Sequence, residues 1–285
     1  MRLALDPAML KALPVEASFR SAANAGYRFV ELGNRDDLIG AFGAVSASPG
    51  DLARLRRAAG GMGVEIASVA VIQAWSSPER EVREQAVAWW RDGIAAARAL
   101  GCDRINTELS GDPARPAESR AALLQSIEEL LPDLERAGID VAAEPHPGDF
   151  IETTTDALEL IASLGGTRVR YLHCLPHAFY LGGSPVEQVE RAGASLDPVH
   201  VADTYRPGRT IVNPAAPGNR VHQHSDIGVG ELDWTAIAGA LGSIRFDGIV
   251  TVQVFGWEER AERSFRLNRA AVTRLLGDGA RAAGR

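Results

Sequence analysis

Residues 65–109 read EIASVAVIQAWSSPEREVREQAVAWWRDGIAAARALGCDRINTEL and contain one complete unit of the pattern that decides the fold. A β-rich run at 65–71 is followed by apolar residues at helical spacing and then by a second β-rich run at 104–109. Strands that alternate with helices in this way are typical of a parallel sheet built from βα units.

The helix between these two runs has its own start and stop signals. Ser77 can cap its N-terminus, Pro78 suits the first helical position, and Gly101 is expected to end it. Apolar residues recur at helical spacing at Val82, Ala86, Trp89, Ala96 and Leu100. This spacing predicts that Trp89 lies in the core, while Trp90 packs between helices.

The same alternation runs through the whole chain and gives eight units. The predicted strands are 3–6, 29–33, 65–71, 104–109, 140–144, 169–175, 198–203 and 248–254. Eight units of about 36 residues match the roughly 250 residues of a (β/α)8 barrel. An open doubly wound sheet is the alternative, but its glycine fingerprint is missing. We predict an α/β fold, a single (β/α)8 TIM barrel over 1–277, with a flexible tail at 278–285.

A long loop at about 204–230, after the seventh strand, is predicted from the absence of helical or strand periodicity. It contains Arg206, Arg209, Arg220, His222 and His224. Loops of this length inside compact domains are usually functional lids or disordered segments, and this composition favours a lid.

Charge and composition exclude several classes of function. The formal net charge of -7 argues against nucleic acid as a partner. Lys11, the only lysine, lies after the first strand, which argues against Schiff-base and pyridoxal-phosphate enzymes. Cys102 and Cys174 are too few for a disulfide framework. With no apolar membrane span and no signal-peptide core, we expect a cytoplasmic protein without a membrane partner.

The histidines mark the predicted active site. All of them lie at or beyond the ends of the fifth, sixth and seventh predicted strands, at His146, His173, His177, His200, His222 and His224. The active site of a (β/α)8 barrel is built at the carboxyl ends of its strands. We therefore expect the chemistry of this chain to lie among these residues.

Three strand ends carry groups that suit a divalent cation. Alternation along the fifth strand points Glu144 and His146 to the same side. In the seventh strand His200 points inward and Asp203 lies at the rim, while Gln253 of the eighth strand offers a carbonyl oxygen. Inward imidazole and carboxylate groups form a plausible site for a divalent cation. A capped strand end is the structural alternative at Glu144.

Short motifs along nearly the whole chain resemble the xylose isomerase-like barrel superfamily, which includes sugar phosphate isomerases and epimerases. They are ALDP at 4–7, FVEL at 29–32, GELDW at 230–234 and FDG at 246–248. The resemblance implies a metal held at the ends of strands five to eight. Its ligand positions fall on Glu144, Cys174, His200 and Gln253, and His177 matches a histidine three residues after the family's aspartate.

Two of these ligand positions depart from the family pattern. Cys174 and Gln253 replace an aspartate and a glutamate, so they supply negative charge only if Cys174 ionises on binding metal. Such a ligand set would bind Mg²⁺ poorly. We expect one divalent metal, manganese first, with iron, cobalt or zinc as alternatives, and His173 as a neighbouring ligand for the sixth strand. A barrel that has lost its metal stays open as an alternative.

The segments HCLPHAFY at 173–180, VADT at 201–204 and VHQH at 221–224 resemble the branch of this superfamily associated with inositol catabolism. Subunits of C-glycoside deglycosidases belong among the relatives. The resemblance implies proton abstraction next to a ketone, with the metal stabilising the enediolate. His146 and His177 are the candidate bases, because imidazole titrates near pH 7, and Glu144 is counted with them as catalytic.

A further set of residues is predicted to bind substrate through carboxylate, guanidinium, imidazole or aromatic groups. These are Glu31, Trp75, Glu108, Arg206, His224 and Trp257. Core packing is the alternative for the tryptophans, and a salt bridge to an arginine is the alternative for the glutamates.

We therefore predict a metal-dependent isomerase or epimerase of a keto sugar or inosose. One alternative is a lyase that cleaves an oxidised glycoside by elimination, and another is a non-catalytic sugar-binding or accessory subunit. DNA repair, known among the endonuclease relatives, fits an acidic chain poorly. The expected partner is a small carbohydrate or polyol, and a homo-oligomer or a second subunit is permitted.

Overall fold

The computed structural model describes residues 1–206 and 224–283. It contains two compact units. Unit one comprises Met1–Val30 and His173–Arg285, and unit two comprises Glu31–Leu172. The predicted fold class is confirmed, because eight parallel strands follow one another in the order of a (β/α)8 barrel. Every predicted strand is present. The predicted bounds of the barrel domain and of its tail stay a prediction.

Unit one is built around neighbouring parallel strands, in which β8 lies between β1 and β7. Its strands are β1 (Arg2–Asp6), β7 (Leu196–Val201), β8 (Ile249–Gln253) and the start of β2 (Phe29–Leu32). β1 pairs with β2 and β8, and β7 pairs with β8, all in parallel. Leu5, Val199 and Val252 of these strands are fully buried, as expected for a parallel sheet that is covered on both faces.

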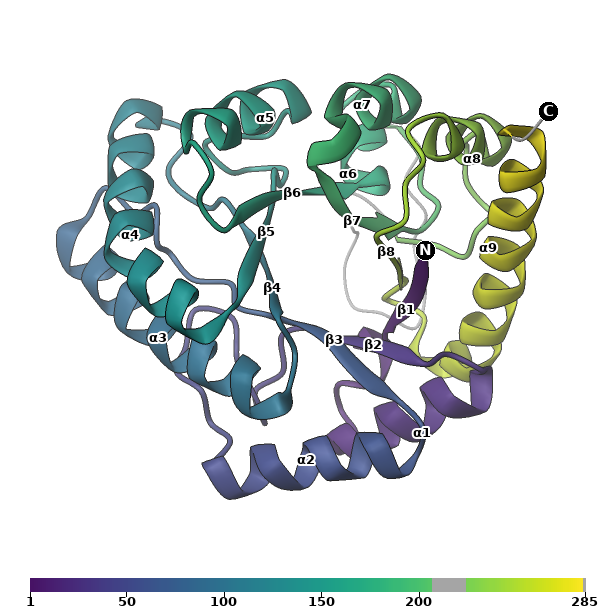
Figure 1. Cartoon of the computed structure of the whole chain (residues 1–285), viewed down its shortest axis with the longest axis horizontal. Coiled ribbons are helices and arrows are strands. Elements are labelled where there is room, and N and C mark those ends of the chain that lie inside the picture. The colour runs from purple at the N-terminus through teal and green to yellow at the C-terminus, as the bar shows by residue number, and fades with distance from the viewer. Residues whose placement is uncertain (207–223, 284–285) are drawn as a thin grey trace. The chain divides into compact units, whose positions relative to one another are not determined.

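Helices cover the strands of unit one. They are η1 (Ala8–Leu10), α1 (Val15–Ala25), α6 (Leu175–Tyr180), α7 (Pro185–Ala192), η2 (Gly193–Ser195), α8 (Trp234–Ser243), η3 (Glu258–Arg260) and α9 (Ala261–Ala283). The long C-terminal helix α9 packs against both α8 and α1, as Figure 1 shows. Tyr27, just after α1, donates its hydroxyl hydrogen to the carbonyl oxygen of Phe265 in α9. Two segments from opposite ends of the chain are thereby joined.

Unit two contains β3 (Glu65–Ala70), β4 (Arg104–Glu108), β5 (Asp140–Glu144) and most of β6 (Val169–Cys174), paired in parallel in that order. Parallel neighbours need a crossover connection, which is helical here. Its helices are α2 (Pro49–Gly61), α3 (Arg80–Leu100), α4 (Pro116–Ala137) and α5 (Thr154–Ser163). In Figure 1, α2, α3 and α4 follow one another as packed neighbours.

Helix α3 corrects two details of the sequence analysis. It begins at Arg80 with Glu79 as its N-cap residue, and not at Pro78 with Ser77 as its cap. Its predicted end is confirmed, because Gly101 takes the left-handed conformation that favours glycine. The predicted core residues Ala86, Ala96 and Leu100 are buried. The prediction was wrong at Trp89, which is half-buried beside the fully buried Trp90, and at Val82, which is exposed. Adjacent residues on a helix lie about 100° apart, so the small buried residues Ala86 and Ala97 place the buried face on Trp90.

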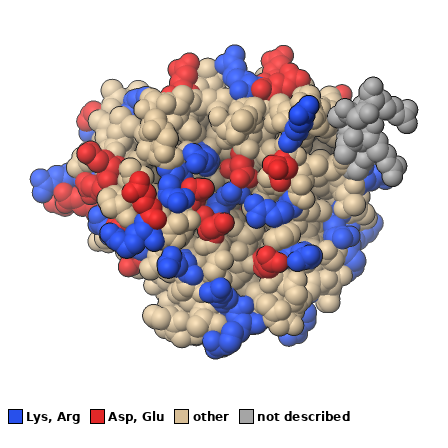
Figure 2. All heavy atoms as spheres, in the orientation of Figure 1, with Lys and Arg blue, Asp and Glu red and all other residues tan. Residues whose placement is uncertain are grey.

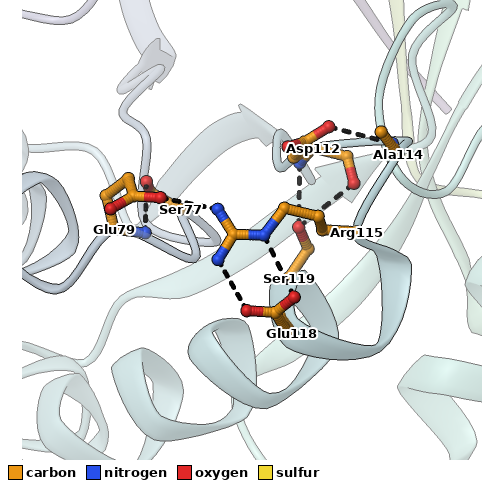
Figure 3. Close-up of polar contacts among 7 residues, drawn as sticks. All are labelled: Ser77, Glu79, Asp112, Ala114, Arg115, Glu118 and Ser119. Atoms are coloured by element: carbon orange, nitrogen blue, oxygen red, sulfur yellow. Dashed lines mark hydrogen bonds and ion pairs between the residues drawn. The ribbon is translucent and has the colours of Figure 1, made fainter.

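The start of α4 is tied to the loop before α3 by a surface network, drawn in Figure 3. Arg115 donates two hydrogen bonds to the carboxylate of Glu118, and a third to Glu79. The hydrogen bonds from Arg115 hold the pKa of Glu118 below its usual value. The ion pairs of Arg115 with Glu79 and Glu118 are exposed to solvent, so we expect them to contribute little to stability.

The surface mixes charges of both signs. Figure 2 shows basic and acidic side chains interspersed on the face in view. Among the described helices, none combines the length and the apolar character needed to cross a bilayer. Most of the predicted loop at 204–230, with Arg209, Arg220 and His222, lies outside the described residues.

Candidate functional site

Unit two brings three titratable side chains together at the carboxyl ends of β4 and β5. Glu108 ends β4, and the two strands pair so that it lies level with Glu144. His146 and Asp149 follow in the loop after β5. Side-chain atoms of Glu108, His146 and Asp149 lie within 4.8 Å of one another. We call these three residues the acid–base cluster.

The acid–base cluster holds its imidazole in a defined orientation. The Nδ1 atom of His146 lies 3.0 Å from the carbonyl oxygen of Pro147. A carbonyl oxygen only accepts hydrogen bonds, so Nδ1 carries the hydrogen. The Nε2 atom lies 3.9 Å from Oε1 of Glu108. In the neutral ring Nε2 is therefore the basic nitrogen, and it faces the carboxylate.

The pKa values of all three residues of this cluster are raised above their usual values. Burial raises the pKa of Asp149 to about 7, with a further rise from Glu108, against lowering by His146 and the backbone of Ser110. Burial also raises the pKa of Glu108, while His146 lowers it. For His146, burial lowers the pKa, but Glu108, Glu144 and Asp149 together raise it above its usual value. Asp149 therefore titrates near neutral pH.

The sequence analysis missed Asp149. Its Oδ2 atom accepts the backbone N–H of Ser110 at 2.7 Å, and Ser110 has a positive φ of 58°. Asp149 thus joins the loop after β5 to the loop after β4. The available signal was a carboxylate soon after a strand end, in the segment EPHPGD at 144–149, but nothing local showed that it turns back toward Glu108.

Two predicted substrate-binding residues of unit two, Trp75 and Glu31, are buried. Trp75 is only 1% exposed, stacks on Trp90 with ring centroids 4.7 Å apart, and donates its indole N–H to the carbonyl oxygen of Glu108 at 3.1 Å. Its ring is thus part of the core and supports the end of β4. Glu31, in β2, is also buried, at 2% exposure.

Unit one brings together a thiol and two imidazoles. Cys174 ends β6, and His177 lies one turn later in α6. The Nε2 atom of His224 lies 3.2 Å from Nε2 of His177 and 3.9 Å from Sγ of Cys174. All three side chains are at least 95% buried. We call these residues the thiol–imidazole cluster.

Contacts on both sides fix the ring of His224. Its Nδ1 atom lies 2.9 Å from the carbonyl oxygen of Gln253, and its ring stacks on Phe255 with centroids 4.3 Å apart. The backbone N–H of Phe255 in turn donates to the carbonyl oxygen of His224. Because a carbonyl accepts, Nδ1 carries the hydrogen and Nε2 presents its lone pair toward His177.

The ligand set predicted from the sequence is divided between the units. Glu144 lies in unit two, whereas Cys174, His200 and Gln253 lie in unit one. His200 is buried in β7, level with Thr251 of β8. The side-chain nitrogen of Gln253 donates to the carboxylate of Asp6 at 3.3 Å. The four-residue ligand set stays a prediction.

Asp203, which the sequence places at the rim of the seventh strand, has a structural role. Its carboxylate accepts from the backbone N–H groups of Thr204, Gly228 and Leu232 and from the indole of Trp234, at 2.8–3.2 Å. Four donors occupy its oxygens, so this carboxylate anchors the chain that leads into α8.

Two predicted substrate-binding residues make cation–π contacts within unit one. The guanidinium of Arg206, which is exposed, lies 4.6 Å from the ring centroid of Phe179. Trp257 is half-buried, with the guanidinium of Arg260 4.2 Å above its ring. Both rings are thereby partly covered.

A family model described as xylose isomerase-like TIM barrel matches residues 19–271 of this chain. That range includes both the acid–base cluster and the thiol–imidazole cluster. No curated protein matches the chain in sequence.

Solved structures of similar fold include sugar epimerases. A D-tagatose 3-epimerase-like protein is 18% identical, with a TM-score of 0.79 and 99% of each chain covered. The IOLI protein with a binding zinc atom is 17% identical, with a TM-score of 0.76, covering 98% of this chain and 99% of that one. The D-psicose 3-epimerase of Clostridium cellulolyticum H10, solved with D-tagatose, is 19% identical, with a TM-score of 0.71 and coverages of 99% and 96%. At these identities the likeness shows the fold.

Proposed function

The chain belongs to the xylose isomerase-like TIM barrel family, and from that premise we propose that it isomerises or epimerises a keto sugar or an inosose. The reaction moves the proton on the carbon next to a carbonyl group. The sugar 3-epimerases of similar fold support this proposal, because each aligns over nearly its whole length.

The acid–base cluster of unit two is the observation that carries the proposal. Removing a proton next to a ketone requires a base that works near neutral pH, and the product forms only when a proton is returned. Glu108, His146 and Asp149 place two carboxyl groups and an imidazole within 4.8 Å at strand ends. This arrangement can accept a proton from substrate and give it back.

In the proposed reaction the basic Nε2 atom of His146 takes the proton. Its Nδ1–H stays bound to Pro147, so the ring keeps its orientation while Nε2 gains and loses the proton. Glu108 stabilises the imidazolium that forms, because its carboxylate faces Nε2 at 3.9 Å. Asp149, held by Ser110, provides a second group through which a proton is exchanged.

One divalent cation is part of the proposal. When bound, it stabilises the negative charge that develops on the carbonyl oxygen of the substrate. The donors of unit one fit such an ion, because thiol and imidazole groups are ligands for borderline cations. The expectation of manganese stays a prediction.

Exchange of the substrate α-proton with deuterium is the experiment that tests the proposal. Ketopentoses, ketohexoses and inososes are incubated with the enzyme in D₂O and followed by ¹H NMR, with and without added Zn²⁺, Co²⁺ or Mn²⁺. His146→Gln is expected to lower the exchange rate by about 10²–10⁴-fold. Glu118→Gln is the matched control, because Glu118 is an exposed carboxylate on α4.

The outcomes separate the rival functions. Exchange that accompanies a new sugar isomer supports the proposal. Exchange with release of an aglycone from an oxidised glycoside assigns the chain to the lyases. Binding of a sugar without any exchange, under every metal condition, contradicts catalysis and leaves a binding or accessory subunit.

A further inference from the structure

We propose that Cys174, His177 and His224 bind one Zn²⁺ or Co²⁺ ion as a thiolate–imidazole site. The proposal deepens the proposed function, since it names the residues that hold its cation, but the binding itself does not depend on that function. The ligand set differs from the one predicted by resemblance, with which it shares only Cys174.

The spacing of the donor atoms matches a tetrahedral ion. Bond lengths of about 2.0–2.1 Å to nitrogen and about 2.3 Å to sulfur place two ligand nitrogens about 3.3 Å apart, and nitrogen and sulfur about 3.6 Å apart. The nitrogens of His177 and His224 lie 3.2 Å apart, and the nitrogen of His224 lies 3.9 Å from the sulfur of Cys174. Small side-chain movements bring all three onto one ion.

The hydrogen bond to Gln253 orients His224 for this task. Metal-binding histidines almost always donate their second ring N–H to a carbonyl, a carboxylate or water, which directs the other nitrogen toward the ion. The Nδ1 atom of His224 makes such a contact with the carbonyl oxygen of Gln253, and the ring rests on Phe255. Gln253 is therefore assigned as a positioning residue for His224.

The local chain geometry supplies the other two ligands together. Cys174 is the residue at which β6 gives way to α6, and His177 lies in the first turn of that helix. The donor atoms of Cys174, His177 and His224 all lie within 4.8 Å of one another. His224, fifty residues further along the chain, completes the set.

The donor types select the ion. Thiolate and imidazole favour zinc and cobalt over manganese, which prefers oxygen ligands. The thiol loses its proton when the ion binds, so binding is weaker at low pH. Three protein ligands leave the fourth position of a tetrahedral ion for water or a substrate oxygen, as in catalytic zinc sites.

Titration of the metal-free full-length protein with Co²⁺ tests the assignment without any substrate. Wild type is expected to bind one Co²⁺ per chain and to develop a thiolate-to-cobalt charge-transfer band, which Zn²⁺ then removes. Cys174→Ser should lose the band, and His177→Gln and His224→Gln should lose stoichiometric binding. Cys102→Ser is the matched control, because Cys102 is also buried but lies in unit two.

The His200→Gln variant distinguishes this site from the ligand set predicted by resemblance. It is expected to keep both the binding of one Co²⁺ per chain and the thiolate-to-cobalt charge-transfer band. Loss of binding in His200→Gln with retention in His177→Gln and His224→Gln would overturn the proposal. So would a wild-type protein that binds no Co²⁺ or shows no thiolate band. Circular dichroism verifies the fold of each variant, and His177→Gln alone decides if His224→Gln does not fold.

The metal and exchange experiments fail independently. A protein that binds Co²⁺ as described but exchanges no substrate proton upholds this site and contradicts the proposed function. Metal-free protein that exchanges protons at the full rate, with no Co²⁺ binding, overturns this site and the cation of the proposed function, and leaves proton transfer by the acid–base cluster standing.

Discussion

The indole N–H of Trp75 donates to the backbone carbonyl oxygen of Glu108 at 3.1 Å, so a core tryptophan supports the strand end from which the acid–base cluster starts. We expect Trp75→Phe to lower the free energy of unfolding by about 2 kcal/mol, because it removes this hydrogen bond and part of the stack on Trp90. Urea denaturation measures the change. Trp89→Phe, at a half-buried neighbour of Trp90, should cost about 1 kcal/mol or less; equal losses in the two variants would contradict the role of Trp75.

The raised pKa of Asp149 predicts a loss of stability as the pH rises. Its pKa is about 7 in the folded chain, against about 3.9 for an unperturbed aspartate. The folded state therefore holds this proton more tightly than the unfolded state, and the resulting stabilisation is complete below about pH 3.9 and is lost as the pH rises through about 7.

Asp149→Asn removes this titration while leaving Glu108, His146 and Glu144 as the charged groups that face the site. We expect the unfolding free energy of wild type, relative to that of the variant, to fall by a few kcal/mol between pH 4 and pH 8. Denaturant titrations at a series of pH values provide the comparison. A constant difference between the two proteins across this range would show that Asp149 does not titrate there.

Replacing Glu108 is expected to lower the pKa of His146. The carboxylate of Glu108 favours the charged imidazole, so Glu108→Gln removes a raising interaction while burial of the ring continues to lower the pKa. NMR titration of the histidine ring signals follows the change. Glu118→Gln should leave the His146 titration where it is in wild type, and a shift of the same size in that variant would count against a local cause.

The four hydrogen bonds to Asp203 predict a strong effect from a small change. Asp203→Asn replaces one carboxylate oxygen by an NH₂ group, which then faces two of the N–H donors that the oxygen had accepted. We expect a loss of about 2–4 kcal/mol in the free energy of unfolding.

Asp233→Asn is the matched control for Asp203→Asn. Asp233 caps α8 by accepting the N–H of Ala236, and asparagine caps helices about as well as aspartate. Chemical denaturation should therefore show little change for Asp233→Asn. An Asp203→Asn protein as stable as this control would mean that the four contacts are not important for stability.

Zinc is expected to stabilise the folded chain through the thiol–imidazole cluster. An ion that binds only the folded state at a hundred times its Kd adds about 2.7 kcal/mol to the free energy of unfolding. The midpoint temperature of thermal unfolding of the wild type should rise with added Zn²⁺ and fall back when a chelator is added. The midpoint of His177→Gln should not change. An equal shift in both proteins would place the zinc elsewhere.

The amino-acid sequence was sufficient to predict the fold. Each strand of this barrel is a short apolar run between turn residues, and the helices have stripes of apolar residues at helical spacing. The eight units are therefore encoded locally. Gly101 illustrates this, because the left-handed conformation that ends α3 is a property of glycine itself. The clustering of histidines after strands five to seven was equally local, and residues of these segments form part of both the acid–base cluster and the thiol–imidazole cluster.

Tertiary structure decided which residues meet. Trp90 and not Trp89 is buried, because the helices and strands around α3 determine which arc of it faces inward. Asp203 anchors this part of the chain because Gly228, Leu232 and Trp234 each donate a hydrogen bond to its carboxylate. No local pattern contains these contacts, since their strength depends on where distant segments lie after packing.

The two clusters show the same division. The sequence identified Glu108, His146, His177 and His224 as candidates by residue type and by position near strand ends, and Cys174 through the resemblance to the family. Only the folded chain brought Asp149 to Glu108, and His224 to Cys174 across fifty residues. Proton sharing and metal coordination act over a few ångströms, so they are determined by the three-dimensional approach of side chains, which residue order by itself leaves undetermined.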